Sequence, residues 1–172
     1  LIPIPSSEPE VKITVAQALI KGDRWEWFLE KAVELGACEI IPLVTEHTVV
    51  RPEKGEGPKK LQRWEKILLA AAKQSGRAKI PSIGEPLALE KWLSGMGKND
   101  GAKKLVCSER DGECATLPEK GENIIVAVGP EGGWSESELG AFSRKGFAPL
   151  SLGPLILRSE TAALKALSLL CR

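Results

Sequence analysis

Strand-like and helix-like segments alternate along all 172 residues of this chain. Apolar stretches rich in β-branched residues predict strands at 11–19, 38–44, 104–109, 123–128 and 147–152. Helical patterns separate most of these strands, as expected where each connection must cross over one face of a sheet. The alternation predicts an α/β fold, with a mostly parallel sheet and helices on both of its faces.

Local signals predict where the helices begin and end. Asp23 and Glu26 have capping-box spacing at the start of one helix, and Gly36 suits its C-terminal end. The other expected elements are helices over 61–75, from near Pro86, over 136–145 and over 159–170, with a short strand at 79–83. Ser135 and Glu138 form a second capping-box pair, so the helix after residue 135 has a well-specified start.

Composition excludes several classes of protein. Apolar residues make up 42% and charged residues 27% of the chain, as in ordinary globular domains. No apolar run approaches the ~18 residues of a membrane span, so no membrane partner is expected. The net charge of +1 argues against a general nucleic-acid-binding protein. The four cysteines lack a CxxC pair and His47 is the single histidine, which argues against a metal site and favours free thiols in a reducing compartment.

A glycine loop, GPEGG, follows the expected strand at 123–128 and covers Gly129 to Gly133. Glycine-rich turns between a strand and a helix often bind ligands through exposed backbone N–H groups. This loop lacks the lysine of a Walker A loop and the spacing of a dinucleotide loop, and Glu131 would repel a polyphosphate. S-adenosylmethionine, which carries hydroxyls, adenine and positive charge, suits the loop better. A structural turn with a surface glutamate is the equal alternative.

A second unusual stretch, LGPLILRSETAAL, begins at Leu152. Gly153 and Pro154 interrupt the chain after a strand, and an apolar segment then leads directly into the last helix. Arg158 and Glu160 at that helix start either pair with each other or form part of a pocket wall. Both loops would lie at the carboxyl edge of the sheet, where open α/β sheets bind ligands.

Together, GPEGGWSESEL and LGPLILRSETAAL resemble the signature of the SPOUT class of RNA methyltransferases. The upstream phrases ALIKGDRWEWFLEKAVELGACEIIPLVTEHTVV and RWEKILLAAAKQSGR are similar to the catalytic domain of one family in that class, ribosomal RNA small subunit methyltransferase E. The resemblance covers roughly residues 11–170. It implies a methyltransferase domain over 11–172, with a tail or linker at 1–10, that methylates N3 of uridine in small-subunit (16S-type) ribosomal RNA.

The family resemblance also implies an architecture that periodicity alone does not predict. It implies a C-terminal deep trefoil knot, S-adenosylmethionine bound at the knot, and a homodimer with the active site at the subunit interface. The partner would be small-subunit ribosomal RNA or the assembled small subunit, in the bacterial cytoplasm or in an organelle. The apolar last helix, through Leu164 and Leu167, is expected to contribute to the dimer interface. The competing hypothesis is a non-catalytic RNA-binding or ribosome-assembly module that keeps this fold.

The resemblance assigns site residues in three groups. The cofactor-binding residues would be Cys107, Ser108, Gly129, Pro130, Glu131, Gly132, Gly133, Leu152, Gly153, Leu155, Ile156, Leu157 and Thr161. Arg158 would stabilise the developing uracil anion, and Glu160 is the candidate general base. Residues 51–79 hold nine lysines and arginines against three glutamates, which indicates either a solvated helix face or an RNA-binding track. The resemblance favours RNA, through Lys59, Lys60, Arg63, Gln74 and Arg77.

Two features depart from the family pattern. Family members usually carry an N-terminal RNA-binding domain of the PUA kind, which the 172 residues do not contain. Many members have an arginine after the second Gly-Pro, where this chain has Leu155. The first difference concerns RNA binding by this chain alone, and the second changes one charge near the cofactor or the RNA.

Overall fold

The computed structural model describes residues 8–51, 57–97, 101–108, 113–114 and 119–171. The elements are β1 (Lys12–Ala18), α1 (Asp23–Glu34), β2 (Ala37–Val44), α2 (Gly57–Gln74), β3 (Ser82–Ile83), β4 (Leu87–Ala88), α3 (Leu89–Gly95), β5 (Lys103–Cys107), β6 (Glu113–Cys114), β7 (Asn123–Val128), α4 (Glu136–Arg144), β8 (Ala148–Ser151) and α5 (Ser159–Leu170). The predicted alternation of strands and helices is confirmed. The short strands β4 and β6 were not predicted, and α3 begins after β4 rather than near Pro86.

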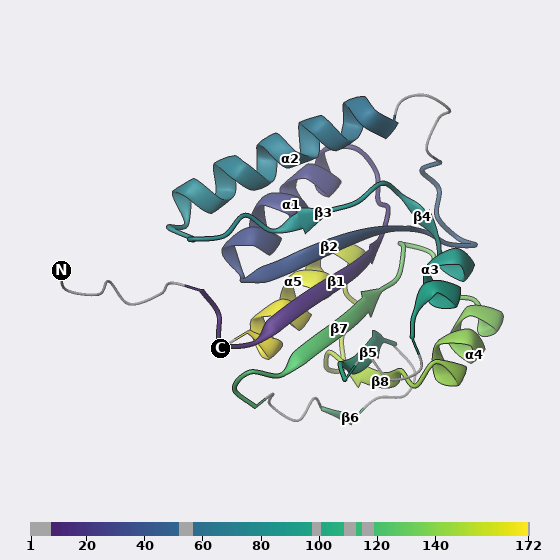
Figure 1. Cartoon of the computed structure of the whole chain (residues 1–172). Helices are drawn as coiled ribbons and strands as arrows, with labels where there is room; N and C mark the ends of the chain where they lie inside the picture. Colours follow the sequence, from purple (N-terminus) through teal and green to yellow (C-terminus); the bar gives the residue numbers. More distant parts are fainter. Residues whose placement is uncertain (1–7, 52–56, 98–100, 109–112, 115–118, 172) are drawn as a thin grey trace.

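Within the described ranges, eight strands form one sheet in the order β3-β2-β1-β7-β5-β8-β6, with β4 also paired to β2 (Figure 1). Each described strand pair is parallel. The loops that follow β5, β7 and β8 therefore emerge at the same edge of the sheet, on three neighbouring strands. That edge is where the sequence places the two unusual loops.

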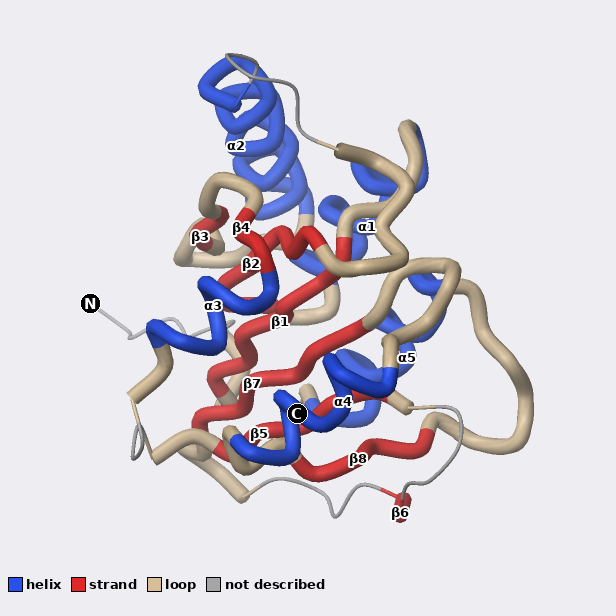
Figure 2. Tube along the Cα trace, turned by 90° about the vertical axis from the view of Figure 1, so that its right-hand side faces the viewer, coloured by secondary structure: helices blue, strands red, loops and turns tan. Residues whose placement is uncertain are grey.

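Helices cover both faces of the sheet, as expected: α1, α2 and α5 pack on one face, and α3 and α4 on the other (Figures 1 and 2). Successive side chains of a strand point to opposite faces. Val15 and Val126 accordingly join the larger core under α1, α2 and α5, while Ala16 and Ala127 join the smaller core under α3 and α4. In the described part of the chain no helix is long and apolar enough to cross a bilayer.

The two predicted capping boxes had different outcomes. The box at α4 is confirmed: the Ser135 hydroxyl accepts from the Glu138 N–H at 3.3 Å, and the Glu138 carboxylate accepts from the Ser135 N–H at 3.0 Å. The box at α1 was wrong. Gly22 holds the cap position with φ of 51° and no side-chain hydrogen bond, so Asp23 is already the first helical residue. A positive φ favours glycine, and this turn moves the helix start by one residue.

Candidate functional site

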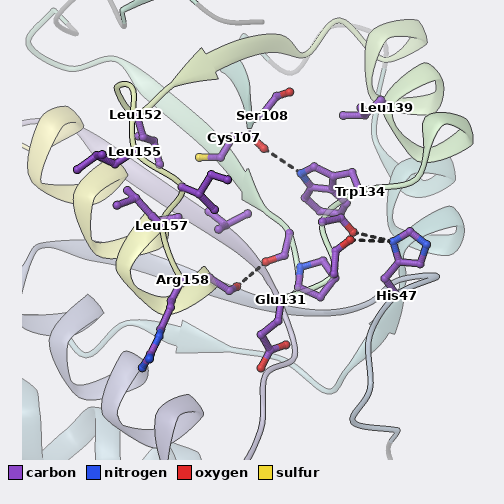
Figure 3. Close-up of a pocket in the computed structure, with 18 of the residues that line it drawn as sticks. His47, Cys107, Ser108, Glu131, Trp134, Leu139, Leu152, Leu155, Leu157 and Arg158 are labelled. Carbon is purple, nitrogen blue, oxygen red and sulfur yellow. Dashed lines mark hydrogen bonds between the residues drawn. The ribbon is translucent and has the colours of Figure 1, made fainter. Parts of the chain in front are cut away.

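A cleft of about 670 Å³ opens at the carboxyl edge of the sheet, between the loops that follow β5, β7 and β8 (Figure 3). Its lining includes Cys107 and Ser108, the segment 128–136, and the segment 152–159. Every residue of the two predicted loops therefore contributes to one cavity. The volume lies within the range of about 300–1,000 Å³ that is usual for small-molecule sites.

The glycine loop is a tight turn held from its β2 side. The Gly133 N–H donates to the Pro130 carbonyl at 3.0 Å, and Gly133 has φ of 70°. Gly132 lies so close to the next segment that a Cβ there would be 2.9 Å from Cβ of His47. Backbone approach of this kind explains a glycine without any ligand, because a larger residue would have to displace the turn after β2.

His47 is a residue of the site that the sequence interpretation missed. It follows β2, and its Nδ1 is 3.1 Å from both the Gly132 and the Gly133 carbonyl oxygens (Figure 3). Because a carbonyl oxygen only accepts, Nδ1 must carry the hydrogen. These hydrogen bonds join the end of β2 to the glycine loop.

Glu138, in the first turn of α4, also connects this part of the chain to the turn after β2. Its side chain is buried; one carboxylate oxygen accepts from the Ser135 N–H and the other accepts from the Glu46 N–H at 2.8 Å. The capping carboxylate of α4 therefore also anchors the turn after β2. Charge-assisted hydrogen bonds of this kind are stronger than neutral ones.

Trp134 connects the glycine loop to β5. Its indole N–H donates to the Cys107 carbonyl at 3.0 Å (Figure 3). Its ring packs edge-on against Phe142 with a centroid distance of 4.8 Å. A Cβ on Gly129 would be 3.2 Å from this ring. Burial raises the pKa of the Cys107 thiol to about 12, so the sulfur that faces the cleft is a neutral wall and no nucleophile.

The loop before α5 has a different character. Leu155 and Ile156 are 76% and 82% exposed, although both border the cleft. Gly153 has φ of 99°, which supplies the turn out of β8. Arg158 lies at the end of this loop with an exposed side chain that extends away from Leu157 and the glycine loop (Figure 3).

Glu160 and Thr161 lie outside the residues that line the cleft. Glu160 is buried, and its carboxylate is 3.9 Å from the Arg24 guanidinium at the start of α1. Its ion pair is therefore with Arg24, where the sequence suggested Arg158 or a pocket wall. Thr161 is exposed on α5. Neither residue therefore lies where the sequence analysis expected it, at the cofactor and the uracil. For Glu160 the reason is the packing of α5 against α1, which turns its side chain away from the cleft.

The residues that the sequence assigned to RNA binding differ in their exposure. Lys59, Arg63 and Gln74 are exposed, and Arg63 pairs with Glu26 of α1 at 2.7 Å. Lys60 is half-buried. Arg77 was placed on the RNA surface by the sequence, yet its side chain is only 5% exposed.

Arg77 instead holds the protein together. It donates to the carbonyl oxygens of Val33 and Ala37 on either side of the turn between α1 and β2, and it pairs with Glu8 at 2.8 Å. Burial raises the pKa of Glu8, but the hydrogen bonds from Arg77 and Lys79 outweigh that effect and lower it overall. Arg77 is a structural residue.

No cluster of three or more potential metal ligands occurs among the residues that the structure describes. The apolar face of α5 likewise belongs mainly to the protein's own core. Leu167, expected at a dimer interface, is fully buried there, and Leu164 packs partly against the same core. Leu169 is the α5 leucine that remains 39% exposed.

Comparison with known proteins identifies the family. The family model described as RNA methyltransferase domain matches residues 7–171. A relative named ribosomal RNA small subunit methyltransferase E, from Mesomycoplasma hyopneumoniae, is 38% identical over 159 residues, covering 92% of this chain and 69% of its own length. A protein of the same name from Bacillus subtilis is 36% identical, covering 94% of this chain and 66% of its own length.

A solved structure of the same kind is similar in fold. The crystal structure of a ribosomal RNA small subunit methyltransferase E from Neisseria gonorrhoeae, bound to S-adenosyl methionine, superimposes with a TM-score of 0.85 at 34% identity. It covers 94% of this chain, and the chain covers 66% of it. This chain thus spans about two thirds of the length of these relatives.

Proposed function

Because the chain belongs to the family of RNA methyltransferase domains, we propose that it transfers a methyl group from S-adenosylmethionine to small-subunit ribosomal RNA. The proposed target atom is N3 of a uridine, as the sequence motifs imply. The observation that carries the proposal is the convergence of the GPEGG loop and the LGPLILR loop on one cleft. The reaction would take place where ribosomes are made, which in bacteria is the cytoplasm.

The charges around the cleft suit this cofactor better than a nucleotide. The ionisable lining residues include Glu131 and Glu136, with Arg158 at the rim, and the described lining contains no lysine. Two carboxylates would repel a polyphosphate but would accept a sulfonium and an ammonium group. Backbone groups of 129–133 and 152–157 would hold the cofactor, and the neutral Cys107 side chain would form part of the wall.

The bound cofactor supplies an electrophilic methyl group; the chain must bring the uracil to it with N3 deprotonated. The chain's own residues would hold the uracil beside that methyl group and stabilise the negative charge that the base carries once its N3 proton has passed to water. Arg158 is the proposed catalytic residue, because an exposed guanidinium at the rim could stabilise the uracil anion. The buried Glu160 carboxylate would act as a general base only if its ion pair with Arg24 were broken. We therefore propose that water, or another group close to the substrate, takes the N3 proton.

The expected knot and homodimer remain part of the proposal. Leu155 and Ile156 of the 152–158 loop, and Leu169 of α5, are the exposed apolar side chains that a second subunit would cover. The exposed side chains of Lys59, Arg63 and Gln74, with the neighbouring Lys60, form the proposed RNA-binding surface along α2. The remaining third of the relatives' length would add to RNA binding.

The test is methyl transfer to small subunits and to naked small-subunit RNA that lack the modification. We expect labelled methyl groups to enter the RNA, and nucleoside analysis to identify 3-methyluridine. Calorimetry on the same preparation should detect binding of S-adenosylmethionine. Binding without transfer to either substrate would leave a non-catalytic module as the function, whereas tight ATP binding with no response to S-adenosylmethionine would contradict the assigned cofactor.

A further inference from the structure

A buried chain of hydrogen bonds joins the two halves of the cleft. Ser159, the first residue of α5, donates from its hydroxyl to the Gly129 carbonyl, the first peptide group of the glycine loop. Gln17, near the end of β1, donates from its amide nitrogen to the same Ser159 hydroxyl at 2.7 Å. Three segments that are far apart in sequence therefore meet at one oxygen atom.

The direction of each hydrogen bond is determined by chemistry. The Gly129 carbonyl only accepts, so the single hydroxyl hydrogen of Ser159 must point to it. The Ser159 oxygen is then available as an acceptor, and the amide of Gln17 supplies the hydrogen. The second amide hydrogen of Gln17 goes to the Ala18 carbonyl at 2.9 Å. This arrangement orients the hydroxyl in one way and leaves no second arrangement of equal energy.

Burial makes these hydrogen-bonded polar groups costly in free energy if they serve only to stabilise the fold. Gln17 is fully buried and Ser159 is 5% exposed. The amide oxygen of Gln17 has no hydrogen-bond partner within the described part of the chain. A buried polar group without a partner costs free energy, and an apolar residue of similar size would avoid that cost. Stability alone therefore does not explain a glutamine at this position.

The location indicates what the chain of bonds accomplishes. Ser159 directly follows the 152–158 loop, and Gly129 begins the glycine loop; both are lining residues of the cleft. His47 and Trp134 fix the far end of the glycine loop against β2 and β5. Among these described side chains, Ser159 is the one that links the glycine loop to the other cofactor loop.

We infer that Ser159 and Gln17 are positioning residues, which hold the two cofactor loops at the separation that S-adenosylmethionine requires. The inference rests on the proposed function, since it concerns the same site. Gln17 acts through Ser159, and Ser159 acts through the backbone of Gly129. Without the hydroxyl, the glycine loop would lose its side-chain hydrogen bond to α5, and the two loops could adopt relative positions that bind the cofactor less well.

The first test measures the loop without any cofactor. Amide hydrogen exchange of peptides that cover 128–136 should be faster in Ser159→Ala and in Gln17→Met than in the wild type, and Ser159→Thr should restore slow exchange. Ser143→Ala, on the exposed face of α4, is the matched control and should leave the exchange unchanged. Equal exchange in all variants would overturn the inference, whether or not the protein is a methyltransferase.

The second test measures the cofactor. We expect the dissociation constant for S-adenosylmethionine to rise roughly tenfold in Ser159→Ala, the usual consequence of losing one buried hydrogen bond. Ser159→Thr should bind as the wild type does, and Gln17→Met should lie between the two. A wild type that does not bind S-adenosylmethionine would defeat the proposed function and leave the exchange result standing. Weak binding in Ser159→Ala that Ser159→Thr fails to restore would overturn the positioning role.

Discussion

The two loops that form the cleft are built in opposite ways. The glycine loop is held by side chains from three directions: His47 beyond β2, Trp134 toward β5, and Ser159 from α5. The 152–158 loop instead displays Leu155 and Ile156, the most exposed large apolar side chains in the described part of the chain. A loop of the first kind has its shape before a ligand arrives. A loop of the second kind still has apolar surface to bury, against a ligand or a second subunit.

The largest expected effect is at the end of the exposed loop. Arg158→Ala should raise the barrier to methyl transfer by about 2–4 kcal/mol, the range for removing one preorganised donor. Cofactor affinity and melting temperature should change little, because the side chain is exposed. Single-turnover kinetics and calorimetry check both statements. A loss of affinity or stability large enough to account for the lost activity would make Arg158 a structural residue.

A substitution in the glycine loop should act through the side chains that hold this loop in place. Gly132→Val places a side chain against His47, because even the Cβ would be 2.9 Å from Cβ of that residue. We expect weaker cofactor binding, by about 1–3 kcal/mol, as for other overpacked sites. The valine could weaken binding either through this clash with His47 or by occupying the cofactor's own space. The substitution His47→Gly distinguishes the two explanations.

If His47 is the obstacle, the double variant Gly132→Val with His47→Gly should bind the cofactor better than Gly132→Val alone. No improvement would indicate that the valine blocks the cofactor itself. Gly140→Ala in α4 is the matched control, because the nearest atom to its new Cβ is the tip of the flexible Arg144 side chain at 3.4 Å. It should bind the cofactor normally.

The exposed loop offers a test of the second subunit. Leu155→Ser should change the free energy of unfolding of the monomer by no more than about 0.5 kcal/mol, as exposed substitutions usually do. It should weaken a dimer by about 1.5 kcal/mol, the lower end of the range for one buried leucine. Analytical ultracentrifugation over a concentration series measures this. A wild type that is monomeric at micromolar concentration would contradict the dimer.

At neutral pH the smallest effect is that of Cys107, the residue between the two loops. Its pKa is raised from 9.0 to about 12, so the unfolded chain loses this proton at lower pH than the folded protein does. The free energy of unfolding should therefore be unaffected by this group below pH 9 and should fall as the pH rises toward 12. Cys107→Ala should remove that part of the decline. A pH dependence identical in both proteins would show that the thiol is accessible to solvent.

The comparison also explains what could be predicted from the sequence. The glycine loop, the α4 capping box and the second loop were readable because each depends on residues close together in the chain. His47 was missed because its role depends on the turn after β2 reaching across β1 to the loop after β7, which is a property of strand order. Arg77 was misplaced because it follows α2 in a turn, and the sequence does not show that this turn packs against the α1–β2 turn. Glu160 was misplaced because its position in a helix does not determine which face of α5 packs against α1. Leu167 shows the same difficulty for apolar residues.

Gln17 and Ser159 are separated by 142 positions along the chain, and their hydrogen bond has a consequence for protein synthesis. The ribosome releases β1 before β7 and α5, so β1 must wait for β7 to become its neighbour in the sheet. The cleft can take its final form only after the C-terminal helix has left the exit tunnel. A nascent chain halted before residue 159 would lack the hydrogen bond to Gly129, so the glycine loop gains this support only after α5 has been made.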